Sequence, residues 1–554
     1  MKKILIANRG EIAIRIARTC NDLGIKTVGI YSEDDFNSLH LSKMDESFVV
    51  DEKGASAYLN IKKIIDIAKK EKVDGIHPGY GFLSENPSFA KAAKQAKIKF
   101  IGPSEKSLKI FGNKSEAKQL ASKLNVPVIT GTKGKTSLKQ ATAFFKGLKK
   151  NSSVIIKAIG GGGGRGMRVV NSQSDLKEAM NRAGSEAKSA FDSSDLYLEE
   201  YLKDYRHVEV QVLGDGKGRA THMHERECST QRRHQKILEI APAPGIKKGL
   251  KEKMLDASLA LIKESKYEGL ATVEFLVNFA KEDFKFIECN ARLQVEHTVT
   301  EAVLGLDLVK AQIQIASGKT LKQLKLEQDN IGEPIGFAVQ SRVNMEVIDS
   351  EGETKPSGGK FTSFDLPSGP GVRSDSYGYS GYETNPAFDS LIAKVITHSP
   401  EDSFKQALKR NYRSLCEFKI EGVPTNLDLL KNILTDSKFR NNELHTNFLD
   451  QNIKNLLSKR NHTDLSDINR SLKKSSLKRG KIEDLDPLAV LDHGKSGGVF
   501  VDESENILEL ESEELGEGLQ SILAPMQGMI VKFEVKKGDE IWKGKPLLIM
   551  EAMK

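Results

Sequence analysis

Polar side chains recur at every second position across residues 285–297, and the residues between them are apolar. Successive side chains of an extended strand point to opposite faces, so this period predicts a strand with one polar face. A solvated strand face usually carries Thr, Ser and Lys, whereas this row mixes acids, amides and a guanidinium. We therefore predict that the row lines a reaction site. Its members are Glu288, Asn290, Arg292, Gln294 and Glu296.

A single carboxylate, Glu274, interrupts an apolar strand predicted over residues 271–277. Burying a carboxylate is costly unless a cation neutralises it. Glu274, Glu288 and Asn290 together offer the oxygen ligands that Mg²⁺ (or Mn²⁺) takes alongside substrate phosphates. The pattern predicts a metal site, and the alternative is a coincidental pair of core acids.

Five consecutive glycines follow an apolar strand predicted over residues 154–158, which carries Lys157. Glycines let backbone N–H groups approach phosphates closely, although a glycine run alone can be a flexible hairpin. The lysine precedes the glycines and no Gly-Lys-Ser/Thr follows, which excludes a Walker-type loop. The arrangement resembles the ATP-grasp fold instead, which implies Lys114 as a second phosphate-binding lysine and residues 199–202 as the segment that reads adenine.

Two further polar groups belong with this site. Residues 229–236 form a dense polar cluster, which predicts an anion-facing loop; the alternative is a basic surface loop. Arg342 lies in a short strand predicted over residues 339–344, where a planar guanidinium would suit recognition of an oxyanion.

The elements that position these residues begin with alternating strand and helix patterns up to about residue 111, which predict a parallel α/β unit. A small α+β module with the glycine loop follows, and then a larger mixed domain. Predicted strands cover 3–7, 27–31 and 75–77, and predicted helices start at residue 11 and cover 61–70 and 87–97.

Two charge blocks follow the mixed domain. Residues 454–481 contain nine Lys or Arg and two acids, whereas residues 483–517 contain twelve acids and one lysine. Such blocks predict a linker, and a solvated helical hairpin is an equal alternative. The domain boundaries we predict are 1–113, 114–203, 204–452, a linker over 453–517 and a last domain over 518–554.

Bulk composition indicates a globular protein of three or four domains, with 38% hydrophobic and 29% charged residues among 554. The small excess of 84 Lys and Arg over 76 Asp and Glu does not indicate nucleic-acid binding. Four scattered cysteines indicate a reducing compartment and no zinc site. Since no apolar run suits a signal peptide or a membrane span, we expect a cytoplasmic protein without a membrane partner.

The sequence ends in Glu-Ala-Met-Lys, and an Ala-Pro-Met motif ends 28 residues before Lys554. This pairing is typical of a carrier domain in which biotin is attached to a lysine at a hairpin tip. Short strands are predicted over 528–534, 539–542 and 546–550. The alternative is a β-meander that happens to end in lysine. A biotinyl domain has about as many residues after the lysine as before it, so we expect this sequence to be part of a longer polypeptide.

Five motifs over residues 1–450 resemble, in order, those of the biotin carboxylases. They are NRGEIA at 8–13, HPGYGFLSEN at 77–86, the glycine loop, QRRHQK at 231–236 and RLQVEH at 292–297. The resemblance implies an α/β fold of the ATP-grasp type, with a Rossmann-like N-terminal domain, a small lid and a mixed α+β C-terminal domain, followed by the linker and a truncated all-β biotinyl domain.

The resemblance also implies a role for each matching residue. Bicarbonate would be bound by Arg292, Gln294, Val295 and Lys236, with Glu296 as the base that deprotonates it for attack on ATP. The resulting carboxyphosphate would supply the carboxyl group for biotin, whose enolate Arg342 would stabilise. Tyr80 and Gly81 would line the biotin pocket. ATP would be held by Lys114, Lys157, Gly162, Gly163, Gly164, Gly166, Glu199, Leu202, His207, Gln231 and His234.

The partners implied are ATP, bicarbonate, a biotin protein ligase that modifies Lys554, and a carboxyltransferase, within an oligomer. The sequence departs from the common biotin carboxylase pattern at Thr298, Glu200 and Met345. With these residues it resembles multidomain acyl-CoA or pyruvate carboxylases more than free-standing biotin carboxylase subunits. The alternatives are an ATP-grasp ligase that makes a carbamoyl or acyl phosphate, a non-enzymatic scaffold, and a lipoyl carrier at the C-terminus. The final carboxyl acceptor is not encoded in these motifs.

Overall fold

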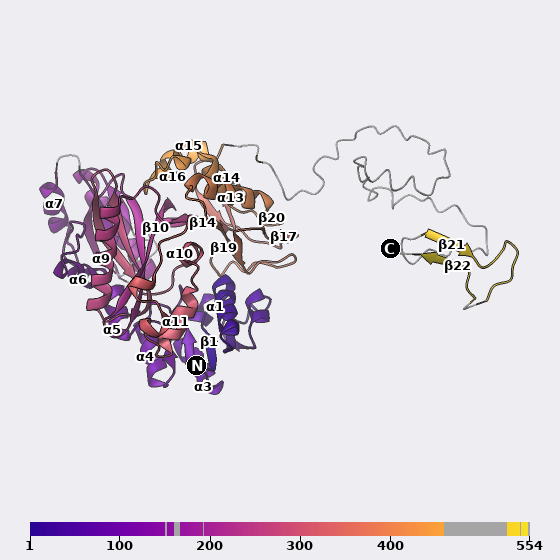
Figure 1. Ribbon diagram of the computed structural model, residues 1–554. Coiled ribbons are helices and arrows are strands. Elements are labelled where there is room, and N and C mark those ends of the chain that lie inside the picture. Colours follow the sequence, from indigo (N-terminus) through magenta and orange to yellow (C-terminus); the bar gives the residue numbers. More distant parts are fainter. Residues whose placement is uncertain are drawn as a thin grey trace. The chain divides into compact units, whose positions relative to one another are not determined.

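The computed structural model describes residues 1–149, 152–159, 167–191, 193–458, 462, 529–542 and 545–551. The chain forms two compact units, Met1–Arg470 and Ser471–Lys554 (Figure 1). Within the described ranges, no helix combines the length and the apolarity needed to cross a bilayer. The predicted linker overlaps the end of helix α16 (Phe448–Leu456), and most of it lies outside the described residues.

The first unit begins with a five-stranded parallel sheet in the order β3-β2-β1-β4-β5. Its strands are short, β1, β2 and β4 are mostly buried, and the helices between the strands return the chain to the same edge, as the alternating pattern predicted. The sequence prediction missed two strands, β3 and β5. The strands are β1 (Lys3–Ile6), β2 (Lys26–Ser32), β3 (Glu46–Val50), β4 (Gly75–His77) and β5 (Lys99–Phe100). The helices are α1 (Gly10–Asp22), the 3-10 helix η1 (Leu39–Lys43), α2 (Ala55–Leu59), α3 (Ile61–Lys70), α4 (Pro87–Gln95) and α5 (Glu105–Gly112).

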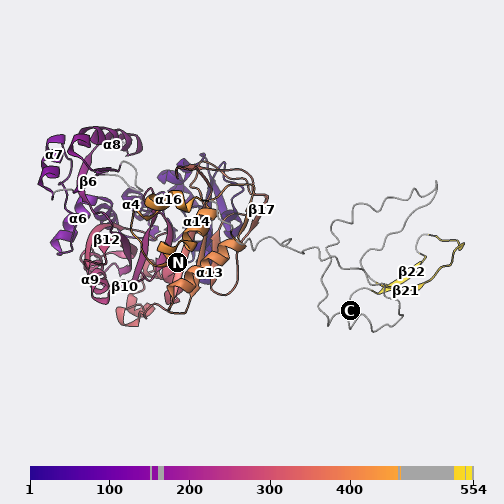
Figure 2. The same ribbon diagram turned by 90° about the horizontal axis from the view of Figure 1, so that it is seen from above.

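A three-stranded antiparallel sheet in the order β7-β6-β8 forms the core of the lid. Its own apolar cluster includes Val154, Ile156 and Leu198. Figure 2 shows α7 and α8 beside β6 at one side of the unit. The strands are β6 (Ser153–Ala158), β7 (Arg168–Val170) and β8 (Leu196–Tyr201). The helices are α6 (Lys114–Lys123), α7 (Leu138–Gly147), η2 (Gln173–Asp175) and α8 (Leu176–Phe191).

The largest sheet has eight antiparallel strands in the order β13-β12-β9-β10-β11-β14-β19-β18. Six neighbouring strands of this sheet carry predicted site residues, so the sheet is the platform of the site. The strands are β9 (Arg206–Asp215), β10 (Ala220–Arg232), β11 (Gln235–Ala241), β12 (Glu268–Asn278), β13 (Asp283–Asn290), β14 (Phe337–Asn344), β18 (Val372–Ser376) and β19 (Leu391–Ser399).

Helices cover the large sheet, and two short strand pairs form separate small sheets. Contacts place α9 on β9 and β10, α10 on β14 and β19, and α13 on β19 and β14. The helices are α9 (Lys248–Glu264), α10 (His297–Leu304), α11 (Leu308–Ala316), α12 (Leu321–Leu324), η3 (Gln328–Asn330), α13 (Phe404–Glu417), α14 (Leu427–Thr435), α15 (Ser437–Arg440) and α16. The short pairs are β15 (Glu346–Ile348) with β16 (Thr354–Pro356), and β17 (Ser363–Asp365) with β20 (Lys419–Glu421).

The second unit contains one described hairpin, in which β21 (Met529–Phe533) pairs antiparallel with β22 (Leu548–Glu551). Both strands agree with predicted ones. The third strand, predicted over 539–542, was wrong, because these residues follow a turn at 537–538 and form no ladder. Lys554, the predicted attachment site, lies outside the described residues.

Candidate active site

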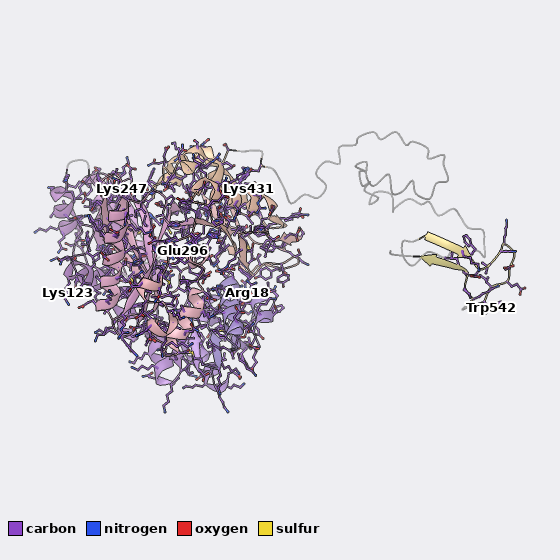
Figure 3. The ribbon with its side chains drawn as sticks, viewed as in Figure 1. Arg18, Lys123, Lys247, Glu296, Lys431 and Trp542 are labelled. Carbon is purple, nitrogen blue, oxygen red and sulfur yellow. The ribbon has the colours of Figure 1, made fainter. Side chains whose placement is uncertain are left out.

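A cavity of about 600 Å³ lies against the large sheet of the first unit. It brings together every described residue that the sequence assigned to the site, except Glu296, which is labelled in Figure 3 and has a fully buried side chain. The predicted residues that line the cavity are Tyr80, Gly81, Lys114, Lys157, Glu199, Leu202, His207, Gln231, His234, Lys236, Glu274, Glu288, Asn290, Arg292, Gln294, Val295 and Arg342. The loop glycines Gly162, Gly163, Gly164 and Gly166 lie outside the described residues.

The alternating row is not one continuous strand, contrary to the prediction. Strand β13 ends at Asn290, the last residue paired with β12. The chain then leaves the sheet because Glu85 accepts hydrogen bonds from the Ala291 N–H (3.1 Å) and from Arg292 Nε (2.9 Å). The remaining residues run as an irregular segment up to Glu296, which immediately precedes α10. The row still reaches the cavity, because the segment after the strand bends along it.

The polar cluster at 229–236 is a β-hairpin, and its prediction as a loop was wrong. Gln231 and Lys236 are cross-strand partners, so their side chains share one face. Arg233 and His234 form the two-residue turn with φ of +49° and +64°, the backbone of a tight hairpin. The polar residues of the cluster are thereby ordered: some face the cavity, while Arg232 lies on the opposite face.

Lys236 is the centre of the buried charge cluster. Its Nζ lies 2.5 Å from Glu209 Oε2, 2.8 Å from Glu274 Oε1 and 2.7 Å from Glu296 Oε1. Burial acts to lower the pKa of Lys236, but the three carboxylates outweigh it and raise the pKa well above its ordinary value. The lysine is therefore a permanent cation in the floor of the cavity.

Glu296 has no exposed surface and bonds two cations. Its Oε1 accepts from Lys236, and its Oε2 accepts from Arg342 NH2 at 2.9 Å. Burial alone would raise the pKa of Glu296, yet Lys236, Arg342 and the buried Arg226 hold it well below its ordinary value. Arg342 is itself oriented by Glu239, which accepts from its Nε. The arrangement keeps a carboxylate ionised beside two donors that suit an anionic substrate.

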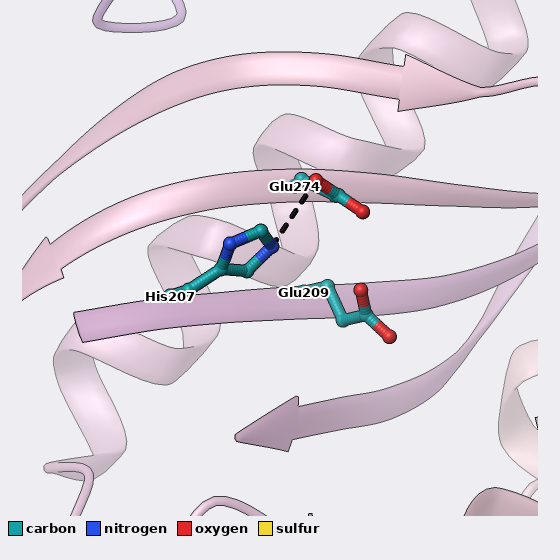
Figure 4. A group of neighbouring side chains, drawn as sticks. All are labelled: His207, Glu209 and Glu274. Carbon is teal, nitrogen blue, oxygen red and sulfur yellow. Dashed lines mark ion pairs between the residues drawn. The ribbon is translucent and has the colours of Figure 1, made fainter. Parts of the chain in front are cut away.

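Figure 4 shows His207, Glu209 and Glu274 grouped on β9 and β12. Their ligand atoms lie close enough to hold a metal ion, and His207 Nε2 is 3.1 Å from Glu274 Oε2. Lys236, however, already contacts both carboxylates. Burial would raise the pKa of Glu274, but Lys236 and His207 lower it. The cation that neutralises Glu274 within the chain is therefore an ammonium group, so burial of this acid does not by itself require a metal.

The predicted metal ligands fit a magnesium site on other grounds. Glu274 and Glu288 are direct partners across β12 and β13, and Asn290 Nδ2 donates to Glu274 Oε1 at 2.8 Å. Glu288 remains partly exposed to the cavity, with a side-chain exposure of 31%. Two carboxylates and an amide on one face of the cavity lining match the few protein ligands that Mg²⁺ takes.

A lysine cluster borders the opposite part of the cavity. Lys157 Nζ on β6 is 2.7 Å from Glu199 Oε2, and Lys118 on α6 pairs with the other oxygen of Glu199. Lys114, one helical turn before Lys118, lies 3.3 Å from Glu288. Burial and the neighbouring lysines lower the pKa of Lys157 to about 8 and that of Lys118 to about 6. The three lysines of the cluster are paired with two carboxylates, Glu199 and Glu288, so the cluster could bind a polyanion.

The remaining wall combines an apolar slot with polar edges. Apolar side chains in the lining are Ile129, Ile155, Met167, Leu202, Leu276 and Ile287. His207 Nδ1 lies 2.9 Å from Gln231 Nε2, and this contact fixes the imidazole ring and the side-chain amide at that edge. Apolar side chains beside fixed polar groups suit a nucleotide base. Tyr80 and Gly81 line the far end, and Gly81 has φ of +70°, a conformation that favours glycine.

Three family models match the first unit. Residues 1–108 match the N-terminal domain of biotin carboxylase, residues 113–324 the ATP-binding domain of the carbamoyl-phosphate synthase L chain, and residues 340–451 the biotin carboxylase C-terminal domain. Biotin carboxylase 1 of Bacillus subtilis is 41% identical over 452 residues, and the match covers 81% of this chain and 98% of that relative. The chain belongs to the biotin carboxylase family.

Longer proteins also contain this biotin carboxylase region. Pyruvate carboxylase of Bacillus subtilis is 45% identical over 456 residues, which cover 81% of this chain but 39% of that relative. The chain thus matches about two fifths of such a protein. The solved biotin carboxylase domain dimer of 2-oxoglutarate carboxylase from Hydrogenobacter thermophilus, described with MgADP and bicarbonate, aligns with a TM-score of 0.79 at 37% identity, over 83% of this chain and 99% of that one.

The family matches on both sides of the ATP-binding region favour a biotin carboxylase over the carbamoyl- or acyl-phosphate ligase alternative. The sequence did not single out four charged residues that pair with the predicted site residues: Lys118, Glu85, Glu209 and Glu239. Lys118 was detectable, because it lies four residues after Lys114 on one helix face. The three acids were not detectable from local spacing, since the predicted site residues that they pair with are 27 to more than 200 residues away in the sequence.

Proposed function

We propose that the chain carboxylates biotin, using ATP and bicarbonate, as the first half-reaction of a biotin-dependent carboxylase. The observation that carries this proposal is the buried Glu296 carboxylate, bonded to Lys236 and Arg342 within one site that also holds a lysine cluster. A base, two anion-binding cations and a polyphosphate-binding region are the groups that joining bicarbonate to a phosphoryl group requires.

The nucleotide would occupy the lysine side of the cavity. Lys114, Lys118 and Lys157 would bind its phosphates, and the apolar slot at Leu202 and Leu276 would take the base. Bound Mg²⁺ would neutralise phosphate charge and polarise the γ-phosphoryl group. Glu274, Glu288 and Asn290 would hold that ion.

Bicarbonate would bind between Lys236 and Arg292, next to Gln294 and the Val295 backbone. Its negative charge would offset the cationic field around Glu296 and raise the pKa of that carboxylate. Glu296 would thereby become a stronger base when bicarbonate is present. The proton would pass to Glu296 as the bicarbonate oxygen attacks the γ-phosphorus and ADP leaves, which forms carboxyphosphate.

Biotin would enter at the end of the cavity lined by Tyr80 and Gly81. Arg342 would stabilise the developing enolate oxygen, because its guanidinium is a permanent cation already oriented by Glu239. Carboxyphosphate would split into CO₂ and phosphate, the released phosphate would take the proton from biotin N1, and N1 would then attack the CO₂ to form carboxybiotin. Exclusion of water by the lid would protect the short-lived carboxyphosphate.

The wider assembly is part of the proposal. Lys554 would carry biotin after modification by a biotin protein ligase, and a carboxyltransferase would pass the carboxyl group to pyruvate or an acyl-CoA. The dimer described for the Hydrogenobacter relative supports an oligomer here. A cytoplasmic location would suit a reaction that consumes ATP and bicarbonate.

The test is ADP release by the full chain with Mg²⁺-ATP, bicarbonate and free biotin. We expect ADP release to require bicarbonate and to rise with biotin. ADP release that ignores biotin but depends on an added amine would favour the carbamoyl-phosphate alternative and reject the proposal.

A further inference from the structure

Lys394 is a fully buried lysine next to the site that has no role in the reaction described so far. It lies on β19 and has no exposed surface. Its Nζ is 3.0 Å from Glu11 Oε1, 3.1 Å from the Val295 carbonyl oxygen and 3.7 Å from Asp375 Oδ2. Burial of an ammonium is costly unless its partners are fixed. This lysine therefore holds parts of three separate elements in one place.

The contact with Val295 acts on the backbone of the bicarbonate region. The Val295 carbonyl and the Glu296 N–H belong to one peptide unit, which is planar. A donor that fixes the carbonyl also fixes the direction of that N–H and the position at which the Glu296 side chain begins. Glu296 immediately precedes α10 in an irregular segment, so none of the described strands orients the Val295–Glu296 peptide unit.

The contact with Glu11 acts on the biotin side. Tyr80 donates its hydroxyl to Glu11 Oε1, the same oxygen that pairs with Lys394. Tyr80 lines the cavity, whereas Glu11 lies behind it on α1 and is buried. Asp375 is separately held by Arg373 at 3.0 and 2.7 Å, so it anchors the lysine from β18.

We infer that Lys394 is a positioning residue, which fixes the Val295–Glu296 peptide and, through Glu11, the Tyr80 ring. The inference rests on the proposed function of the cavity. It assigns Lys394 to the bicarbonate and biotin half of the site and not to the nucleotide half, where Lys114 and Lys157 lie on α6 and β6.

The experiment compares the full chain with Lys394→Met and with the double variant Glu11→Gln, Lys394→Met. The double variant lowers the risk of misfolding, because a neutral glutamine at position 11 leaves no buried carboxylate without its cation. Asp375 still pairs with Arg373 in both variants. The KM values for bicarbonate, free biotin and ATP are measured from ADP release. Lys251→Met is the matched control. Lys251 Nζ lies 3.4 Å from Oε2 of the buried Glu225, and Lys251 does not line the cavity.

The wild-type chain must first show bicarbonate-dependent ADP release, and its failure would reject the proposed function itself. Given that activity, we expect the KM for bicarbonate to rise about tenfold in any folded Lys394 variant, as loss of a charged hydrogen bond predicts. The KM for biotin should rise too, while the KM for ATP stays within about twofold of wild type, the scatter expected at surface sites. A bicarbonate KM that stays at the wild-type value, an equal rise for ATP, or the same change in Lys251→Met would overturn the inference.

Discussion

Glu274 and Glu288 face each other as direct partners on the antiparallel strands β12 and β13. Each acid has its own cation in the chain: Lys236 lies 2.8 Å from Glu274, and Lys114 lies 3.3 Å from Glu288. Glu288 is the more exposed of the two, with 31% of its side chain accessible against 7% for Glu274. Glu288 is therefore the carboxylate more available to a metal ion.

Glu288→Gln is expected to raise the Mg²⁺ concentration required for half-maximal ADP release by about tenfold, since one charged metal ligand becomes neutral. A magnesium titration at fixed ATP measures the change. Asp365→Asn serves as a control, because Asp365 is an exposed acid on β17. An unchanged magnesium requirement in Glu288→Gln would remove this residue from the metal site.

Arg342→Met is expected to slow carboxylation of free biotin by at least about a hundredfold, because the enolate loses its stabilising cation. Nucleotide binding should persist, since the lysine cluster is intact. Isotope-labelled bicarbonate transferred to biotin gives the first quantity, and a nucleotide titration gives the second. Equal loss of both would mean that Arg342 supports the fold and has no separate part in the biotin step.

Lys118, whose pKa is lowered to about 6, loses its charge at lower pH, and ATP affinity is expected to fall further as pH rises above about 8, the pKa to which burial and Lys114 lower Lys157. Bound phosphates would raise this pKa again, so binding takes up a proton wherever the free lysine is neutral. The loss is up to about tenfold in affinity per pH unit above that pKa. Calorimetric titrations in two buffers of different ionisation enthalpy measure the proton uptake.

Lys157→Met should bind ATP more weakly and lose the part of the pH dependence that begins near 8. Lys146→Met, on α7 outside the cavity lining, is the control and should retain it. A wild-type affinity that is constant through this range would contradict the assignment of Lys157 to the phosphates.

Arg232→Met is expected to lower the free energy of unfolding by about 3–5 kcal/mol, because it leaves a buried carboxylate unpaired. Arg232 donates two hydrogen bonds to Glu346, at 2.8 and 2.6 Å, and both side chains are about 6% exposed. Chemical denaturation of the full chain measures the loss. Replacing both residues with Met should recover much of it, and no recovery would mean that packing of Arg232 outweighs its charge.

The sequence predicted the composition of the site better than its backbone. The alternating polar residues from Glu288 to Glu296 line the cavity or contact its lining, yet the strand expected for them stops at Asn290. The reason is Glu85, about two hundred residues earlier, which captures the chain at Ala291 and Arg292. A period-two pattern records which side chains share a face, and it contains no information about a distant acid that ends the strand.

The hairpin at Gln231 and Lys236 gives a similar lesson. The residue types indicated anion binding, but a run of polar residues concealed the strand period, and the turn lacks the usual Asn-Gly or Asp-Gly sequence. The surroundings of Glu274 also differ from the prediction. The charge of Glu274 was expected to need a metal ion, whereas Lys236 and His207 supply the balancing groups. Tertiary pairing of this kind is not encoded in local spacing.

In the proposed function, carboxylation of biotin depends on the buried Glu296 carboxylate between Lys236 and Arg342. The most direct measurement is transfer of isotope-labelled bicarbonate to free biotin by the wild-type full chain and by Glu296→Gln, with Mg²⁺-ATP present. We predict labelled carboxybiotin from the wild type and a loss of at least about a hundredfold in the variant, the contribution typical of a general base. Equal transfer by the two proteins would exclude Glu296 as the base, and no transfer by a wild type that cleaves ATP would exclude biotin as the acceptor.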